Sequence, residues 1–96
     1  MTEAVQTLEL PGRVDSTTLG SLLEALKEKR GRPLDLDGSA VDRIGGQGLQ
    51  LIISAMKTWA EDGHQFRIVE PSAALVANTE RLGFPIVQMD GAQGLT

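Results

Sequence analysis

The chain has 96 residues, which predicts a single domain spanning residues 1–96, because domains usually run to about 100–150 residues. With 9 Lys and Arg against 13 Asp and Glu the formal net charge is −4, which argues against nucleic acid or a polybasic membrane patch, since both need a surplus of cations on one face. The absence of Cys excludes disulfides, Cys-ligated zinc and a thiol nucleophile.

Neither end of the chain nor its interior shows a targeting or membrane segment. The first ten residues carry Glu3 and Glu9 and no basic stretch, unlike a signal peptide. Every apolar run is far shorter than the roughly 20 residues of a membrane helix. We therefore expect a cytoplasmic protein with no inserted segment.

The first elements in chain order are two short strands and a helix. Residues 5–10 and then residues 13–14 are typical of strands separated by a Pro11-Gly12 turn, and the first strand is expected at a sheet edge in antiparallel sense. Asp15 or Ser16 is expected to cap the helix that follows, and Gly31 to end it. Its apolar residues recur at helical spacing, at Leu19, Leu22, Leu23 and Leu26.

The rest of the chain continues the alternation. Residues 33–36 and 66–69 predict strands, and residues 49–61 predict a second helix with a wide apolar arc that includes a buried Trp59. A third helix is expected to begin at a Ser72 cap and end at Gly83, with a short strand at residues 86–87 and a frayed tail at residues 90–96. This order predicts an α/β domain with a mostly parallel mixed sheet of four to five strands and three to four helices packed on it.

The residues that could carry catalysis or bind a metal are few. His64 is the only His, and a solvated His past a helix end is a simpler interpretation than a catalytic one. Asp35, Asp37 and Asp42 could offer carboxylates to a metal, but they more often cap turns. We therefore expect no enzyme activity, no metal and no cofactor.

The most informative stretch is Gly45-Gly46-Gln47-Gly48, between a strand-like segment and an apolar helix. Its glycines allow close backbone approach. A tight structural turn, an anion site at the helix start and a flat docking patch for a partner protein all fit this composition. Because no P-loop Lys accompanies the glycines, the docking patch is favoured over a nucleotide cradle.

Residues 36–49 resemble the central signature of the STAS domain, a family that includes bacterial anti-sigma-factor antagonists and cytoplasmic domains of sulfate transporters. Asp37 matches the Asp at a strand end, and Ile44, Gly48 and Leu49 match the residues that frame the family's Asp-Ser-Ser/Thr-Gly-Leu loop. Residues 66–72 and 82–84 match later elements, so the resemblance extends from residue 5 to residue 87. It implies a STAS-like fold and a non-enzymatic role in bacterial signal transduction.

One departure from the family pattern concerns regulation. In the antagonists a loop Ser or Thr is phosphorylated, but here the aligned positions are Gly45, Gly46 and Gln47, and Gln47 stands at the modified position. Phosphorylation is therefore excluded at that position, and Ser39 is the nearest substitute candidate. Residues 41–51, with Trp59 and the Gly63-His64 pair, also resemble small stand-alone STAS proteins that accompany chemotaxis genes.

These observations predict a module that binds a protein partner, such as a signalling kinase or its regulator, as a monomer or weak homodimer. Two alternatives remain: an accessory STAS subunit of a membrane transporter complex, and a small-nucleotide sensor that uses the helix start at Gly48. The residues predicted to bind the partner are Asp37, Ser39, Asp42, Arg43, Ile44, Gly45, Gly46, Gln47 and Gly48.

Overall fold

The computed structural model describes residues 4–84 and shows a small α/β domain, as predicted. The predicted strand at residues 86–87 and the tail at residues 90–96 lie outside the described residues. The elements in chain order are β1 (Gln6–Glu9), β2 (Arg13–Val14), α1 (Leu19–Glu28), β3 (Leu34–Asp37), β4 (Arg43–Ile44), α2 (Gly46–Glu61), β5 (Phe66–Val69) and α3 (Ala73–Arg81).

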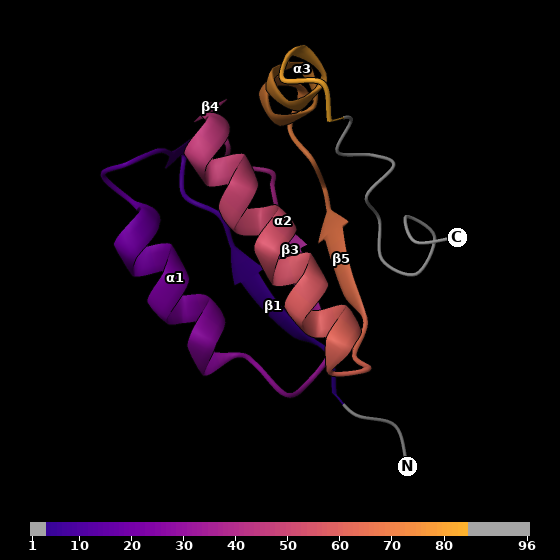
Figure 1. Cartoon of the computed structure of the whole chain (residues 1–96). Coiled ribbons are helices and arrows are strands. Elements are labelled where there is room, and N and C mark those ends of the chain that lie inside the picture. The colour runs from indigo at the N-terminus through magenta and orange to yellow at the C-terminus, as the bar shows by residue number, and fades with distance from the viewer. Residues whose placement is uncertain (1–3, 85–96) are drawn as a thin grey trace.

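The strands form two separate sheets. The main sheet has the order β1-β3-β5, and β2 pairs with β4 in a two-stranded sheet. The first strand lies at the edge of the main sheet, as predicted. Every pairing among residues 4–84 is parallel, so the predicted antiparallel sense of the first strand is wrong. The reason is visible in Figure 1: α1 returns the chain from the end of β2 to the start of β3, so β3 runs in the same direction as β1.

Helices α1 and α2 cover one face of the main sheet. In Figure 1, α1 and α2 lie across this face, and α3 lies at the carboxyl ends of the strands. Leu34 and Leu36 of β3 alternate with half-buried aspartates, and only the leucines enter the core, because successive strand side chains point to opposite faces. On the other face Arg67 Nε and Nη2 donate to Asp35 at 3.0 and 2.9 Å.

Helix α2 packs centrally and begins three residues earlier than predicted, at Gly46 rather than residue 49. Its buried residues form one stripe, and Trp59 is only 2% exposed. The indole N–H donates to the Arg32 carbonyl at 2.8 Å, and the ring centroid lies 5.5 Å from that of Phe66. The prediction of a buried Trp59 is therefore confirmed.

The helix ends agree with the sequence at α3 and differ at α1. Ser72 Oγ accepts from Leu75 N at 3.0 Å, which confirms the predicted cap. Gly83 follows α3 with a φ of +83°, as expected of a Schellman ending. Asp15 does not cap α1: the N-cap residue is Thr18, and Asp15 Oδ1 instead accepts from Thr17 N and Oγ1, because the turn before the helix brings these donors nearer.

The predicted ending of α1 is also displaced. The helix ends at Glu28 with Lys29 as C-cap, so Gly31, with a φ of +101°, lies in the turn beyond the cap. Within residues 4–84 no helix combines the length and the apolar character that crossing a membrane requires.

Candidate functional site

The predicted site lies where the strands of the main sheet end. Parallel strands bring their carboxyl ends to one edge, where binding residues tend to gather. The segment after β3 leaves at this edge, forms β4 and enters α2 (Figure 1). Backbone bonds hold it: the Gly12 carbonyl accepts from Asp42 N at 2.7 Å and Arg43 N at 3.1 Å, and the Gly38 carbonyl accepts from Ser72 N at 3.1 Å.

The glycine-rich stretch is the start of α2 and not a loop, which corrects the prediction. Gly45 is the N-cap residue, its N–H donates to the Val14 carbonyl at 3.2 Å, and its own carbonyl accepts from Leu49 N at 3.0 Å. No side chain caps this helix, and its first turn contains no acidic residue. The first-turn N–H groups of Gly46 and Gln47 have no acceptor within the helix, and both residues are exposed.

The three glycines of this stretch have different surroundings. A Cβ built at Gly45 or Gly46 would meet no atom within 4 Å. A Cβ at Gly48 would lie 2.5 Å from the Val14 carbonyl oxygen and 2.6 Å from Val14 Cγ1. Gly45 and Gly46 therefore leave open space outside the helix, whereas Gly48 lets α2 approach β2.

Two residues of the predicted binding set are inside the molecule. Ile44 is 3% exposed, and Gly48 is also buried. Both face the core because β4 alternates an exposed with a buried residue and because Gly48 packs on β2. Direct contact between these two residues and a partner is not supported; they hold the surface in place.

Asp37 and Ser39 form a separate turn after β3. Asp37 Oδ1 accepts from Ser39 N at 2.8 Å. Hydrogen bonds from the backbone and then the side chain of Ser39 hold the pKa of Asp37 below its ordinary value. Ser39 is exposed. Gly38, between them, is buried against α3, since a Cβ there would lie 2.5 Å from Leu75 Cδ2.

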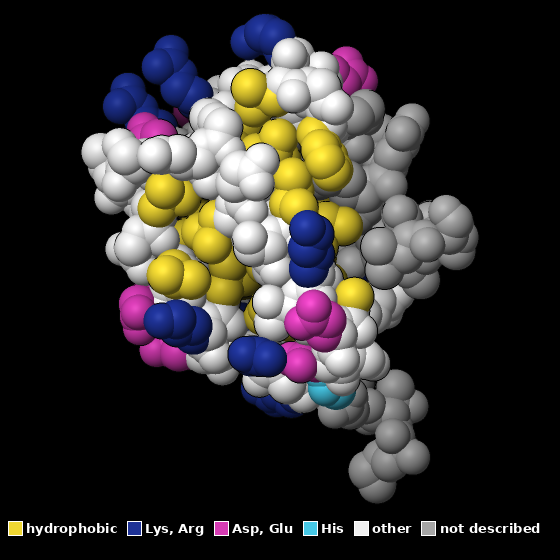
Figure 2. Space-filling view, in the orientation of Figure 1, with side chains coloured by type: hydrophobic (Ala, Val, Ile, Leu, Met, Phe, Trp, Pro, Cys, Tyr) yellow, Lys and Arg dark blue, Asp and Glu magenta, His cyan; other side chains and the backbone are white. Residues whose placement is uncertain are grey.

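The exposed residues next to the start of α2 are close together in the sequence, on either side of the buried Ile44. We call Asp42, Arg43, Gly45, Gly46 and Gln47 the docking surface. All are exposed except Gly45, which is half-buried. The outward side of α2 continues from this surface along the helix through Gln50, Ser54 and Lys57. In Figure 2 this polar stripe runs between two apolar areas.

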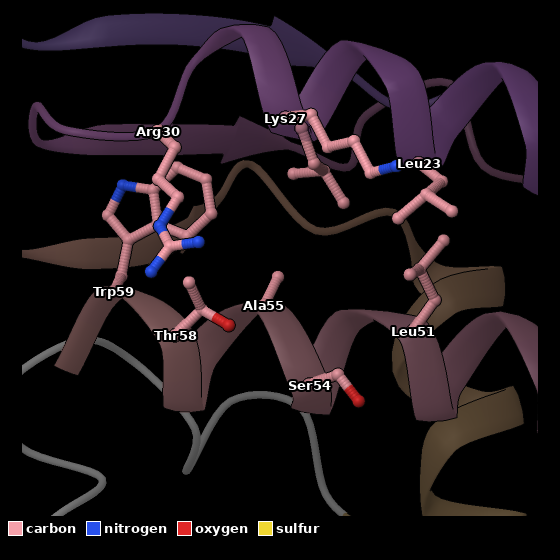
Figure 3. A pocket seen from close by; sticks show the side chains of 9 residues that line it. Leu23, Lys27, Arg30, Leu51, Ser54, Ala55, Thr58 and Trp59 are labelled. Atoms are coloured by element: carbon pink, nitrogen blue, oxygen red, sulfur yellow. The ribbon is translucent and has the colours of Figure 1, made fainter. Parts of the chain in front are cut away.

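Sequence reasoning did not anticipate a groove between α1 and α2 (Figure 3). Its apolar side chains include Leu23, which is 40% exposed, and Leu51, and its volume is about 200 Å³. That volume is below the roughly 300 Å³ at which small-molecule pockets begin. At its rim Arg30 is bonded to Asp62 at 2.8 Å. The signal in the sequence was Leu23, which widens the apolar face of α1 toward α2.

A second hollow bears on the nucleotide alternative. It measures about 470 Å³ and lies between the end of β1 and α1, with Glu9 as its one charged lining residue. Because the lining contains a carboxylate and no Lys or Arg, binding of a phosphate group in this hollow is disfavoured. Gly48, predicted as the anion site, is buried, because α2 already begins at Gly46.

The residue considered for catalysis, His64, lies away from the docking surface. His64 follows Gly63 after the C-terminal end of α2, and the backbone N–H of His64 donates to the Trp59 carbonyl at 2.9 Å. Residues 4–84 contain no group of three or more His, Cys, Asp or Glu side chains arranged to hold a metal ion.

The comparison with known families agrees with this fold. A family model described as "Mlab, STAS domain" matches residues 1–88, so the chain belongs to the STAS family. Domains of this family are generally binding modules and not enzymes. No curated protein and no solved structure matches the chain.

Proposed function

We propose that this chain is a protein–protein interaction module of bacterial signal transduction and that it binds its partner through the docking surface. The observation that carries the proposal is the open space at Gly45 and Gly46. A Cβ built at either position would have no neighbouring side chain or distant backbone atom within 4 Å. A partner backbone can therefore approach the first turn of α2 closely. The exposed Gln47 side chain offers it both a donor and an acceptor.

The surface is proposed to be permanently competent for binding. Gln47 carries no hydroxyl, so the charge of about −2 that phosphorylation adds to related surfaces cannot be placed there. Ser39 is exposed and remains the substitute candidate. The chain would then act as an unregulated competitor or adaptor at this position, in the cytoplasm and as a monomer or weak homodimer.

The resemblance to small STAS proteins encoded near chemotaxis genes directs the search for a partner first to signalling kinases and their regulators. A crosslinking pull-down from the native cell would identify it. Recovery of a membrane ATPase in place of a soluble kinase would favour the transporter subunit. Isothermal titration with GTP and ATP tests the nucleotide sensor, and we expect no heat.

The binding surface itself is tested with a matched pair of glycine substitutions. Gly46 and Gly20 both lie in the first turn of a helix, and a Cβ at either meets nothing within 4 Å. We expect Gly46→Trp to abolish capture of the partner and Gly20→Trp to leave it unchanged, with the midpoint of thermal unfolding little altered in both. Normal capture by Gly46→Trp would refute the proposal.

A further inference from the structure

Two arginines lie side by side on the small β2–β4 sheet, although the chain as a whole is acidic. Arg13 and Arg43 are direct partners in the parallel register, as are Val14 and Ile44. Both arginines are exposed, and the next pair is buried at 0% and 3%. Because side chains at paired positions point to the same face, both guanidinium groups project from the outer face of this sheet.

Within the described part of the chain, this pair of arginines forms no ion pair. Among residues 4–84, neither guanidinium group has a carboxylate within ion-pair distance. Like charges directly opposite each other on neighbouring strands repel. The nearby Asp15 carboxylate offsets part of this repulsion, and an added anion would offset more of it.

Two carboxylates lie near the arginines: one is hydrogen-bonded to another residue, and the other turns away. Asp15 Oδ1 accepts from Thr17 Oγ1 at 2.6 Å; hydrogen bonds from Thr17 chiefly, and then the charges of Arg13 and Arg43, hold the pKa of Asp15 below its ordinary value. The Asp42 carboxylate turns toward Gly12, where Oδ2 would lie 3.7 Å from an added Cβ. Neither aspartate pairs with the arginines.

Arg43 belongs to the docking surface, and its partner Arg13 extends this surface onto β2. β4 leads through Gly45 directly into α2, and the Gly45 N–H is bonded to the Val14 carbonyl, one residue after Arg13. Figure 2 shows Lys and Arg side chains, with an Asp or Glu side chain beside them, at the end of the molecule where β4 and the start of α2 lie. A partner segment seated on Gly46 therefore has both guanidinium groups beside it.

We propose that Arg13 and Arg43 select an acidic segment of the partner protein, whose carboxylates pair with the two guanidinium groups while its backbone lies against the first turn of α2. This inference rests on the proposed function and specifies the chemistry of the partner. A short protein segment is favoured over nucleic acid or an anionic membrane, because those two need a surplus of cations across a whole face, which a chain of net charge −4 lacks. Two arginines are enough to pair with a segment that carries a few carboxylates.

The test uses a defined probe, an end-capped peptide of alternating Glu and Ser residues, with a Gln-for-Glu peptide as its control. The peptides are titrated into isotope-labelled full-length protein while backbone amide signals are recorded. We expect the acidic peptide to shift the amides of Arg13, Val14, Arg43 and Gly46, and the Gln peptide to leave them unmoved. Raising the salt from about 0.1 M to about 1 M, which shortens the screening length from about 10 to about 3 Å, should abolish the shifts.

Charge variants then assign the effect to the arginines. The double substitution Arg13→Gln with Arg43→Gln should weaken peptide binding about tenfold, as expected for two exposed ion pairs. The control Lys27→Gln with Lys29→Gln removes the same charge from the C-terminal end of α1, away from the docking surface, and should leave binding unchanged. Three results would overturn the inference. The two double variants could weaken binding equally, or the acidic peptide could cause no shifts. The same amides could also shift only with single-stranded DNA or anionic vesicles.

The partner assay separates this inference from the function on which it rests. If Gly46→Trp loses the partner while the arginine double variant captures it normally at low and high salt, the acidic-segment inference fails and the docking surface stands. If Gly46→Trp captures the partner normally, the docking surface itself fails. Loss of capture in both variants, with the lysine variant normal, supports both.

Discussion

At the scale of single residues, the surroundings of each glycine decide what that glycine does. Gly45, Gly46 and Gly48 look equivalent in the sequence, yet only Gly48 lies against another part of the chain, at the Val14 backbone and side chain. A glycine in a helix usually costs stability relative to Ala. At Gly48 that cost is offset by the close approach of α2 to β2, whereas at Gly46 the open space is available to a partner.

This difference predicts opposite effects of the same substitution. Gly48→Ala should lower the free energy of unfolding by about 1–3 kcal/mol, because its Cβ would overlap Val14 and force α2 away from β2. Gly46→Ala should leave it unchanged or raise it by up to about 1 kcal/mol, because the space is open and the helix gains a better residue. Urea unfolding of both variants checks this, and equal destabilisation would contradict the assigned packing.

At the scale of elements, the three helices differ in whether a side chain caps their first turn. Ser72 caps α3 and also links it to the segment that precedes β4, since its hydroxyl donates to the Val41 carbonyl at 2.6 Å. No side chain caps α1 or α2. The start of α2 is therefore accessible, whereas the start of α3 is tied to the chain that supports the docking surface.

The double role of Ser72 makes it a sensitive position. Ser72→Ala removes the acceptor for Leu75 N and the donor to Val41, and should cost about 1–2 kcal/mol of unfolding free energy. Ser54→Ala, at an exposed helix position with no such bonds within the described chain, is the control and should change stability by less than about 0.5 kcal/mol. Denaturant midpoints measure both, and a Ser72 variant as stable as the control would contradict the role of the cap.

At the scale of the whole molecule, the helices and the main sheet share one core. Buried side chains from strands and helices contact one another in a single cluster, and Trp59 joins α2 to β5 through Phe66 and to the chain before β3 through Arg32. The docking surface lies at one end of this core, where β4 and the start of α2 meet. Its shape therefore depends on the packing of elements distant in sequence.

The buried Trp59 reports on this core. Trp59→Ala should cost about 3–5 kcal/mol, a large part of the roughly 5–10 kcal/mol that a domain of this size has. We expect a variant that is largely unfolded near physiological temperature, whereas Trp59→Phe, which keeps the ring but loses the bond to Arg32, should remain folded. In the unchanged protein, Trp fluorescence and far-ultraviolet circular dichroism should give coincident unfolding curves; separate curves would contradict a single core.

The order and type of most elements follow from local sequence, because hydrophobic spacing, the Ser72 cap and Gly83 act over a few residues. A buried Trp59 and a mostly parallel α/β fold were predictable on that basis, and the family was predictable from the resemblance of residues 36–49 to the STAS signature. The early start of α2 was not, since Gly46 and Gly48 are poor helix formers and only packing on β2 holds them in the helix. Nor was the two-residue strand β4, whose pairing with β2 joins residues 30 positions apart. The sequence by itself thus determined the order of most elements and the apolar faces of the helices. Only the tertiary structure decided which residues of the predicted binding set face outward and that Arg13 stands beside Arg43, because these depend on contacts between segments that local pattern does not encode.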